Sequence, residues 1–190
     1  MDSIDTLLTL YRLKDESRIG WQIRGVVDPE SVADHSWATA LLCLLYADKA
    51  GVNRDHAVAM ALVHDLAESV TGDVATRVHD ADRAVSTAEK QQRERAAMDG
   101  LAPEPHAVRA LWDEYEAAET NEARFVRDMN LVDMCLQALC YERDHRYDAT
   151  TNYPNQGGYR HLDEFFATAA PRITTELGRT LYEQVRRRYE

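Results

Sequence analysis

Residues 62–74 read LVHDLAESVTGDV and belong to a run, 54–68, whose apolar residues recur at helical spacing. Asn53 precedes this run as a suitable N-cap, so a helix over 54–68 is predicted. His64 and Asp65 place two ionisable residues where that helix should be apolar. Neighbouring helical side chains point about 100° apart, so one ion held by both lies where the helix ends or is distorted. We interpret the pair as metal ligands, and a satisfied buried histidine beside a capping aspartate is the alternative.

The preceding run, SVADHSWATALLCLLYADKAG (31–51), predicts a second helix that ends at Gly51. His35 lies in this run among apolar residues that should face the core. Because only a short loop joins the two helices, they are expected to run antiparallel and to bring His35 close to His64. Two imidazoles and a carboxylate suit a borderline divalent metal such as Mn, Fe, Co, Ni or Zn.

Helical periodicity dominates the rest of the chain, and alternating runs typical of strands are absent. The segment 14–30, with two glycines and a proline, is expected to be a loop. We therefore predict an all-α fold of about six to eight helices. Besides 31–51 and 54–68, the expected helices are a short one around 7–11, a polar and exposed one at 86–101, 106–119, 121–147, and two near the C-terminus.

Composition limits the classes of partner. The chain has 190 residues, few glycines and prolines and no low-complexity stretch, which favours one domain over 1–190. A net charge of −11 disfavours nucleic acid as a polymer but leaves a small phosphorylated substrate possible. We expect three reduced thiols, no signal peptide, no membrane span and a cytoplasmic location.

Two more carboxylates follow the His–Asp pair. Glu68 lies one turn after His64, on the same helix face, and Asp73 follows the expected helix end. Carboxylates near a metal can accept a proton from water or deliver one to a leaving group. The alternative is a pair of surface carboxylates at a helix C-terminus, where the helix dipole disfavours them.

Three stretches together resemble the HD-domain phosphohydrolases, and more narrowly the 5′-deoxynucleotidases. They are RIGWQIRGVVDPESVADHSW (18–37), ALVHDLAESVTGD (61–73) and EARFVRDMNLVDMCLQA (122–138), and the resemblance covers roughly residues 7–145. It implies a single helical HD domain with one divalent ion per chain (Mn, Co, Fe, Ni, Zn or Mg). It also implies a homodimeric phosphoric monoester hydrolase of nucleotide metabolism that acts on deoxyribonucleoside 5′-monophosphates.

The resemblance also implies roles for single residues. His35 corresponds to the first metal ligand, and His64 and Asp65 correspond to the pair that names the family. Glu68 and Asp73 correspond to the acidic residues credited with proton transfer and water activation.

Arg18 and Trp21 correspond to the segment that contacts the phosphate and walls the sugar and base. Arginine suits this place because its guanidinium binds phosphate in a bidentate manner. Arg24 and Arg77 are further candidates for cations near the pocket. So few cations favour a substrate with a single phosphate over a triphosphate.

One position departs from the family pattern. The fourth ligand of the family is an aspartate, and the matching residue here is Asn130, whose oxygen is neutral. Asp133 follows one turn later, in a position where the family also favours an acid. Two alternative functions therefore stay open: another HD nucleotide phosphohydrolase, such as a triphosphohydrolase, and a catalytically weakened nucleotide-binding protein.

Overall fold

The computed structural model describes residues 3–101, 106–151, 158–159 and 161–190, and in these ranges it contains helices and no strand. Eight of its α-helices have seven residues or more, and two are shorter. The all-α prediction is therefore confirmed. The α-helices are α1 (Ser3–Tyr11), α2 (Ile19–Ile23), α3 (Val32–Ala50), α4 (Arg54–Val63), α5 (Glu68–Thr71), α6 (Thr87–Leu101), α7 (His106–Ala117), α8 (Asn121–Arg143), α9 (Asp163–Ala169) and α10 (Glu176–Tyr189).

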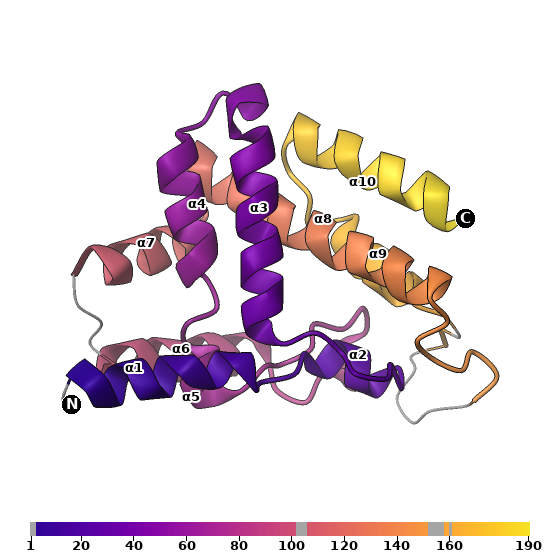
Figure 1. The fold of residues 1–190 in the computed structure, drawn as a ribbon, viewed down its shortest axis with the longest axis horizontal. Helices are drawn as coiled ribbons and strands as arrows, with labels where there is room; N and C mark the ends of the chain where they lie inside the picture. The colour runs from indigo at the N-terminus through magenta and orange to yellow at the C-terminus, as the bar shows by residue number, and fades with distance from the viewer. Residues whose placement is uncertain (1–2, 102–105, 152–157, 160) are drawn as a thin grey trace.

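Helix α8 is the centre of the fold. It packs against α3, α4, α7, α9 and α10, and Figure 1 shows α3 crossing in front of it while α10 lies beside it. Its buried side chains include Phe125, Val126, Met129, Val132 and Cys135. No helix in the described ranges combines the length and apolarity that a membrane crossing requires.

The α3–α4 hairpin forms as the sequence predicts. Ser31 and Asp34 make a reciprocal capping box, in which each side chain accepts from the backbone N–H of the other. The helix ends at Gly51, whose φ of 72° is a conformation that glycine adopts without steric cost. Asn53 then caps α4 by accepting from the backbone N–H of His56 at 3.0 Å.

The predicted helix over 54–68 is wrong in its last third, because α4 ends at Val63. The chain then makes tight turns, in which the amides of Leu66 and Glu68 bond to carbonyls three residues back, before the single turn of α5. This distortion changes the directions of residues 64–68. It is the arrangement that lets adjacent His64 and Asp65 face one point.

Four other predicted segments differ from the structure. The expected loop at 14–30 contains α2, whose first amide, Ile19 N–H, donates to Asp73 Oδ2 at 2.6 Å. The last helix turns predicted before 119 and 147 are absent. Helix α6 is not wholly exposed, because it buries one face; that face consists of Glu94, Ala97, Met98 and Leu101.

Candidate metal centre and active-site cavity

Two buried histidines face one another between α3 and the end of α4. His35 is fully buried on α3, and His64 is 2% exposed directly after α4. Their ring centroids are 5.3 Å apart, and neither Nε2 atom has a hydrogen-bond partner among the described residues. A buried polar atom without a hydrogen-bond partner costs free energy, so the two Nε2 atoms indicate that a ligand binds between the histidines.

The other ring nitrogen of each histidine is bound. His64 Nδ1 lies 2.7 Å from the carbonyl oxygen of Ala61, and His35 Nδ1 lies 2.7 Å from Asp133 Oδ2. An Nδ1–H that donates to an oxygen leaves the Nε2 lone pair pointing into the site, as in metal-binding histidines. Burial, reinforced by the charge of Arg18, lowers the pKa of His35 to about 3, so its ring is neutral.

Asp65 completes the donor set. Its Oδ2 lies 3.1 Å from His64 Nε2 and 3.8 Å from His35 Nε2, and the three ligand atoms lie within 4.8 Å of one another. Each of these atoms offers an electron pair, so they repel one another unless a cation lies between them. The donor set therefore fits a divalent ion held by two nitrogens and one oxygen.

Asn130 and Asp133 reach the site from α8. Asn130 lines the same cavity as His64 and Asp65, and its Nδ2 donates to the Tyr115 hydroxyl at 2.8 Å. This bond leaves Oδ1 as the end of the amide that can face an ion. Asp133 contacts His35 instead, a position from which a carboxylate can orient a histidine ligand; the sequence did not point to this contact.

Glu68 and Asp73 lie close to the donor set in different environments. Glu68 is 2% exposed; its Oε1 pairs with Lys90 Nζ at 3.2 Å, and its Oε2 has no hydrogen-bond partner. Burial, together with the Asp65 and Asp73 carboxylates, raises the pKa of Glu68 well above its ordinary value. Asp73 holds the backbone of Ile19, as described above.

Arg18 and Trp21 wall the cavity from the segment around α2. Arg18 Nη1 lies 3.4 Å from both Asp65 Oδ2 and Asp73 Oδ1. Trp21 is 1% exposed, donates from Nε1 to Glu30 Oε1 at 2.9 Å and stacks on Phe165 at 3.9 Å between ring centroids. Both residues are held rigidly before any ligand enters.

The cavity beside these residues has a volume of about 190 Å³. Its cationic lining is not the one expected from the sequence, because Arg24 and Arg77 do not line it. Both bind the buried carboxylate of Glu164, Arg77 through Nε at 2.9 Å. Arg18 is joined in the cavity wall by cations that the sequence reading missed: Lys90, Arg127 and Arg172.

Several known proteins are similar to this chain in sequence and in fold. The family model for the HD domain matches residues 10–173, so the chain belongs to the HD-domain family. The 5′-deoxynucleotidase HDDC2 of Xenopus laevis is 41% identical over 136 residues, which are 69% of this chain and 65% of that protein. The HDDC2 protein of Danio rerio is 36% identical over 177 residues, covering 88% of this chain and 78% of its own.

Solved structures of other proteins are also similar to this fold. A protein of Pyrococcus horikoshii OT3 superimposes with a TM-score of 0.74 at 31% identity, covering 98% of each chain. A predicted metal-dependent phosphohydrolase from Magnetospirillum magnetotacticum gives a TM-score of 0.65 at 28% identity, covering 98% of this chain and 92% of its own.

Proposed function

We propose that this chain is a metal-dependent phosphomonoesterase that hydrolyses deoxyribonucleoside 5′-monophosphates to a deoxynucleoside and phosphate. The observation that carries the proposal is the convergence of two buried histidines and the partly buried Asp65 carboxylate beside a cavity lined with cations. The printed names of the relatives, 5′-deoxynucleotidases, support the class of substrate. The printed name of the Magnetospirillum magnetotacticum structure supports metal-dependent phosphate chemistry.

In this proposal His35, His64 and Asp65 hold one divalent ion, with Asn130 Oδ1 as a fourth ligand. Nitrogen and oxygen ligands together suit Mn, Co, Fe, Ni or Zn, and Mg is the candidate that depends most on the oxygens. Such an ion supplies Lewis-acid chemistry at a phosphoryl oxygen and lowers the pKa of water.

Proton transfer falls to Glu68. During hydrolysis the oxygen of water bonds to phosphorus and the water gives up one proton, while the bond from phosphorus to the 5′ oxygen breaks and that oxygen takes up one proton. Burial and the neighbouring Asp65 and Asp73 carboxylates raise the pKa of Glu68, which favours the protonated form that a proton donor needs, and its Oε2 makes no hydrogen bond that would hold it away from the cavity. Asp73 is the second candidate, but its Oδ2 is already bound to the Ile19 amide.

Arg18 and Trp21 shape the place of the substrate. Asp65 and Asp73 hold the Arg18 guanidinium at the cavity wall, where it offsets charge that develops on the phosphoryl group. The Trp21 ring, fixed between Glu30 and Phe165, limits the space for the sugar and base.

The test measures phosphate release from deoxynucleoside mono-, di- and triphosphates with each of several divalent metals. We expect the monophosphates to be turned over fastest and only with metal present. His64→Ala should lose both metal and activity while keeping its helical circular-dichroism spectrum, because it removes one ligand and no secondary structure. His161→Ala, which changes an exposed histidine outside the cavity, is the matched control.

Faster turnover of a triphosphate than of the matching monophosphate would replace this activity with the triphosphohydrolase alternative. Nucleotide binding with metal present but without any phosphate release would instead identify a binding protein.

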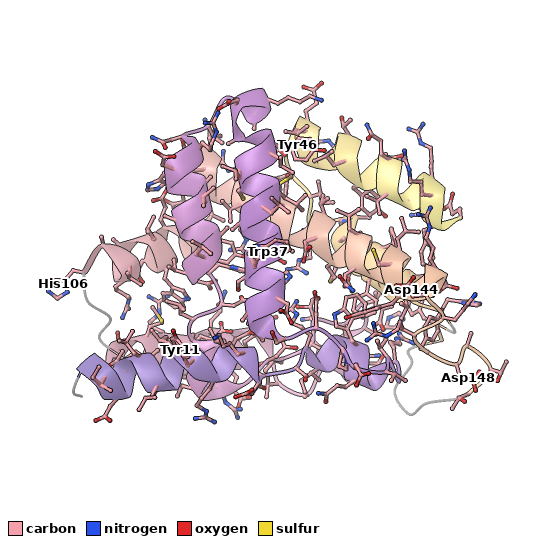
Figure 2. All side chains as sticks on the ribbon, in the orientation of Figure 1. Tyr11, Trp37, Tyr46, His106, Asp144 and Asp148 are labelled. Carbon is pink, nitrogen blue, oxygen red and sulfur yellow. The ribbon has the colours of Figure 1, made fainter. Side chains whose placement is uncertain are left out.

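We also propose that the protein is a homodimer. An apolar surface, named here the α1–α3 face, consists of Ile4, Leu7, Leu8, Tyr11, Trp37, Leu41, Leu44 and Leu45, which expose 37% to 64% of their surface. In Figure 2, Tyr11 and Trp37 lie on helices at the front of the view. Eight such side chains provide apolar area on the order of several hundred Å², comparable to the roughly 800 Å² that each partner buries in a standard interface. A second copy of this chain fits it, because an isologous contact pairs the same apolar residues.

A cytoplasmic location completes the proposal. Cys43, Cys135 and Cys140 are all unpaired, and burial raises the pKa values of the Cys43 and Cys135 thiols. Thiols that remain reduced suit the compartment in which nucleotides are metabolised.

A further inference from the structure

The cations of the cavity differ in whether a carboxylate neutralises them. Arg18 pairs with Asp65 and Asp73, and Lys90 pairs with Glu68 and Glu94 at 3.2 and 3.1 Å. The positive charges of Arg18 and Lys90 are therefore largely neutralised by carboxylates of the protein.

Within the described part of the chain, Arg127 and Arg172 have no such carboxylate. Arg127 Nη1 donates to the backbone carbonyls of Tyr115 and Glu116 at 3.0 and 3.4 Å, which are neutral acceptors. The Arg172 guanidinium has no hydrogen bond or ion pair with any described residue, although it lines the cavity and is exposed to solvent. The chain has 33 acidic and 22 basic residues, so two arginines without a neutralising carboxylate in one cavity wall give that wall a local positive charge. Such a wall favours a negatively charged ligand.

Both residues are placed to act at the candidate metal centre. Arg127 lies three residues before Asn130 on α8, which is about one helical turn, so the two share a face. Arg172 enters from the connection between α9 and α10. Partial desolvation against the cavity wall lowers the pKa of Arg172, although one side of the residue is open to solvent, and repulsion from the positive charges of Arg127, Arg83 and Arg18 lowers it further. An anion bound among these charges would relieve that repulsion.

We propose that Arg172, supported by Arg127, binds the phosphate group of the substrate and is the principal free cation of the phosphate site. A phosphate monoester carries close to two negative charges and several acceptor oxygens, which match two guanidinium groups. A neutral base or sugar would not relieve repulsion between the arginines. The inference rests on the proposed phosphomonoesterase function, and it adds a residue for which that function had no role.

The experiment measures binding of inorganic phosphate to metal-loaded protein by calorimetry, which requires no turnover. Arg172→Gln should weaken phosphate binding about tenfold, the value of one charge-assisted hydrogen bond. Arg172→Lys should retain most of the affinity because it keeps the charge. Arg143→Gln is the matched control, since it removes an exposed and unpaired arginine outside the cavity and should change nothing.

Kinetics separate phosphate recognition from base recognition. For a deoxynucleoside monophosphate the KM of Arg172→Gln should rise with the phosphate dissociation constant, whereas inhibition by the deoxynucleoside alone should not change. Unchanged phosphate affinity in Arg172→Gln would overturn the inference, and so would a loss confined to deoxynucleoside binding. If the wild-type protein binds phosphate through Arg172 but releases none from monophosphates, the proposed function fails and the phosphate site stands.

Discussion

Asp133 and Asn130 lie one helical turn apart on α8 and serve the candidate metal centre in different ways. Asp133 fixes the ring of His35 from behind, while Asn130 faces the cavity with its amide held by Tyr115. A carboxylate behind a histidine ligand sets its tautomer and raises its basicity. The two positions can therefore be tested separately.

Asp133→Asn should weaken metal binding by about 10- to 100-fold, because the amide keeps a hydrogen-bond acceptor for His35 Nδ1 but loses the negative charge. Titration of the metal-free protein with Mn²⁺ or Co²⁺ measures the change. Asp144→Asn, at the exposed end of the same helix, controls for the loss of one charge. Equal metal affinity of Asp133→Asn and wild type would remove Asp133 from the account of the site.

Asn130→Asp should tighten metal binding and raise activity at limiting metal, with a smaller gain at saturating metal. The substitution adds one negative charge beside the ion, and the Tyr115 hydroxyl can donate to the new carboxylate. The measurement is activity as a function of metal concentration for both proteins. If the two curves reach half-maximal activity at the same metal concentration, Asn130 is not a ligand.

The sequence was informative where residue type conflicted with its surroundings. His35, His64 and Asp65 could be singled out because ionisable side chains in apolar helical runs need a reason. The cations could not be assigned in the same way. Arg24 and Arg77 were taken for pocket residues, but their direction depends on Glu164, which lies at least 87 residues further along the chain.

Helix α10 rests on α8 through a contact between a glycine and a buried carboxylate. Asp128 is fully buried and accepts from the backbone amides of Thr174 and Thr175 at 3.0 and 2.7 Å. A Cβ added to Gly178 would lie 2.8 Å from Cβ and Cγ of Asp128, with the carboxylate oxygen closer still. The glycine is therefore needed for a close approach within a helix.

Gly178→Ala should lower the free energy of unfolding by about 1–3 kcal/mol, because the overlap with Asp128 outweighs the better helix propensity of alanine. Gly100→Ala is the matched control, since a Cβ at this glycine of α6 meets no atom within 4 Å. That control should leave stability unchanged or raise it by up to about 1 kcal/mol. Urea denaturation compares them, and equal effects at both glycines would contradict the packing argument.

At the level of helices, the capping residues could be predicted from the sequence, whereas the point at which a helix breaks within an apolar run could not. Gly51 and Asn53 mark the α3–α4 turn through residue types with known backbone preferences. The end of α4 at Val63 carries no such mark, because apolar spacing continues to Leu66. Tertiary packing decides the break, and the site depends on it.

At the scale of the whole molecule, the α1–α3 face predicts how copies associate. Trp37→Glu should convert the proposed dimer into a monomer, because it places a charge within the apolar surface. Light scattering at micromolar concentration measures the state. Val27→Glu is the matched control, since Val27 is 60% exposed but lies in the connection before α3, beside Arg146. A monomeric wild-type protein would refute the homodimer.

Glu164 has a consequence for motion. Its carboxylate accepts from Arg77 Nε at 2.9 Å and from the Val78 amide at 3.3 Å and pairs with Arg24, so one buried group joins α9, α2 and the segment between α5 and α6. Ala75 and Thr76 of that segment line the cavity, and only the short turn at 80–82 gives it regular structure. A local opening of this wall would have to break bonds to a carboxylate that lies outside the cavity. Protection of the Val78 amide against hydrogen exchange reports that local opening directly.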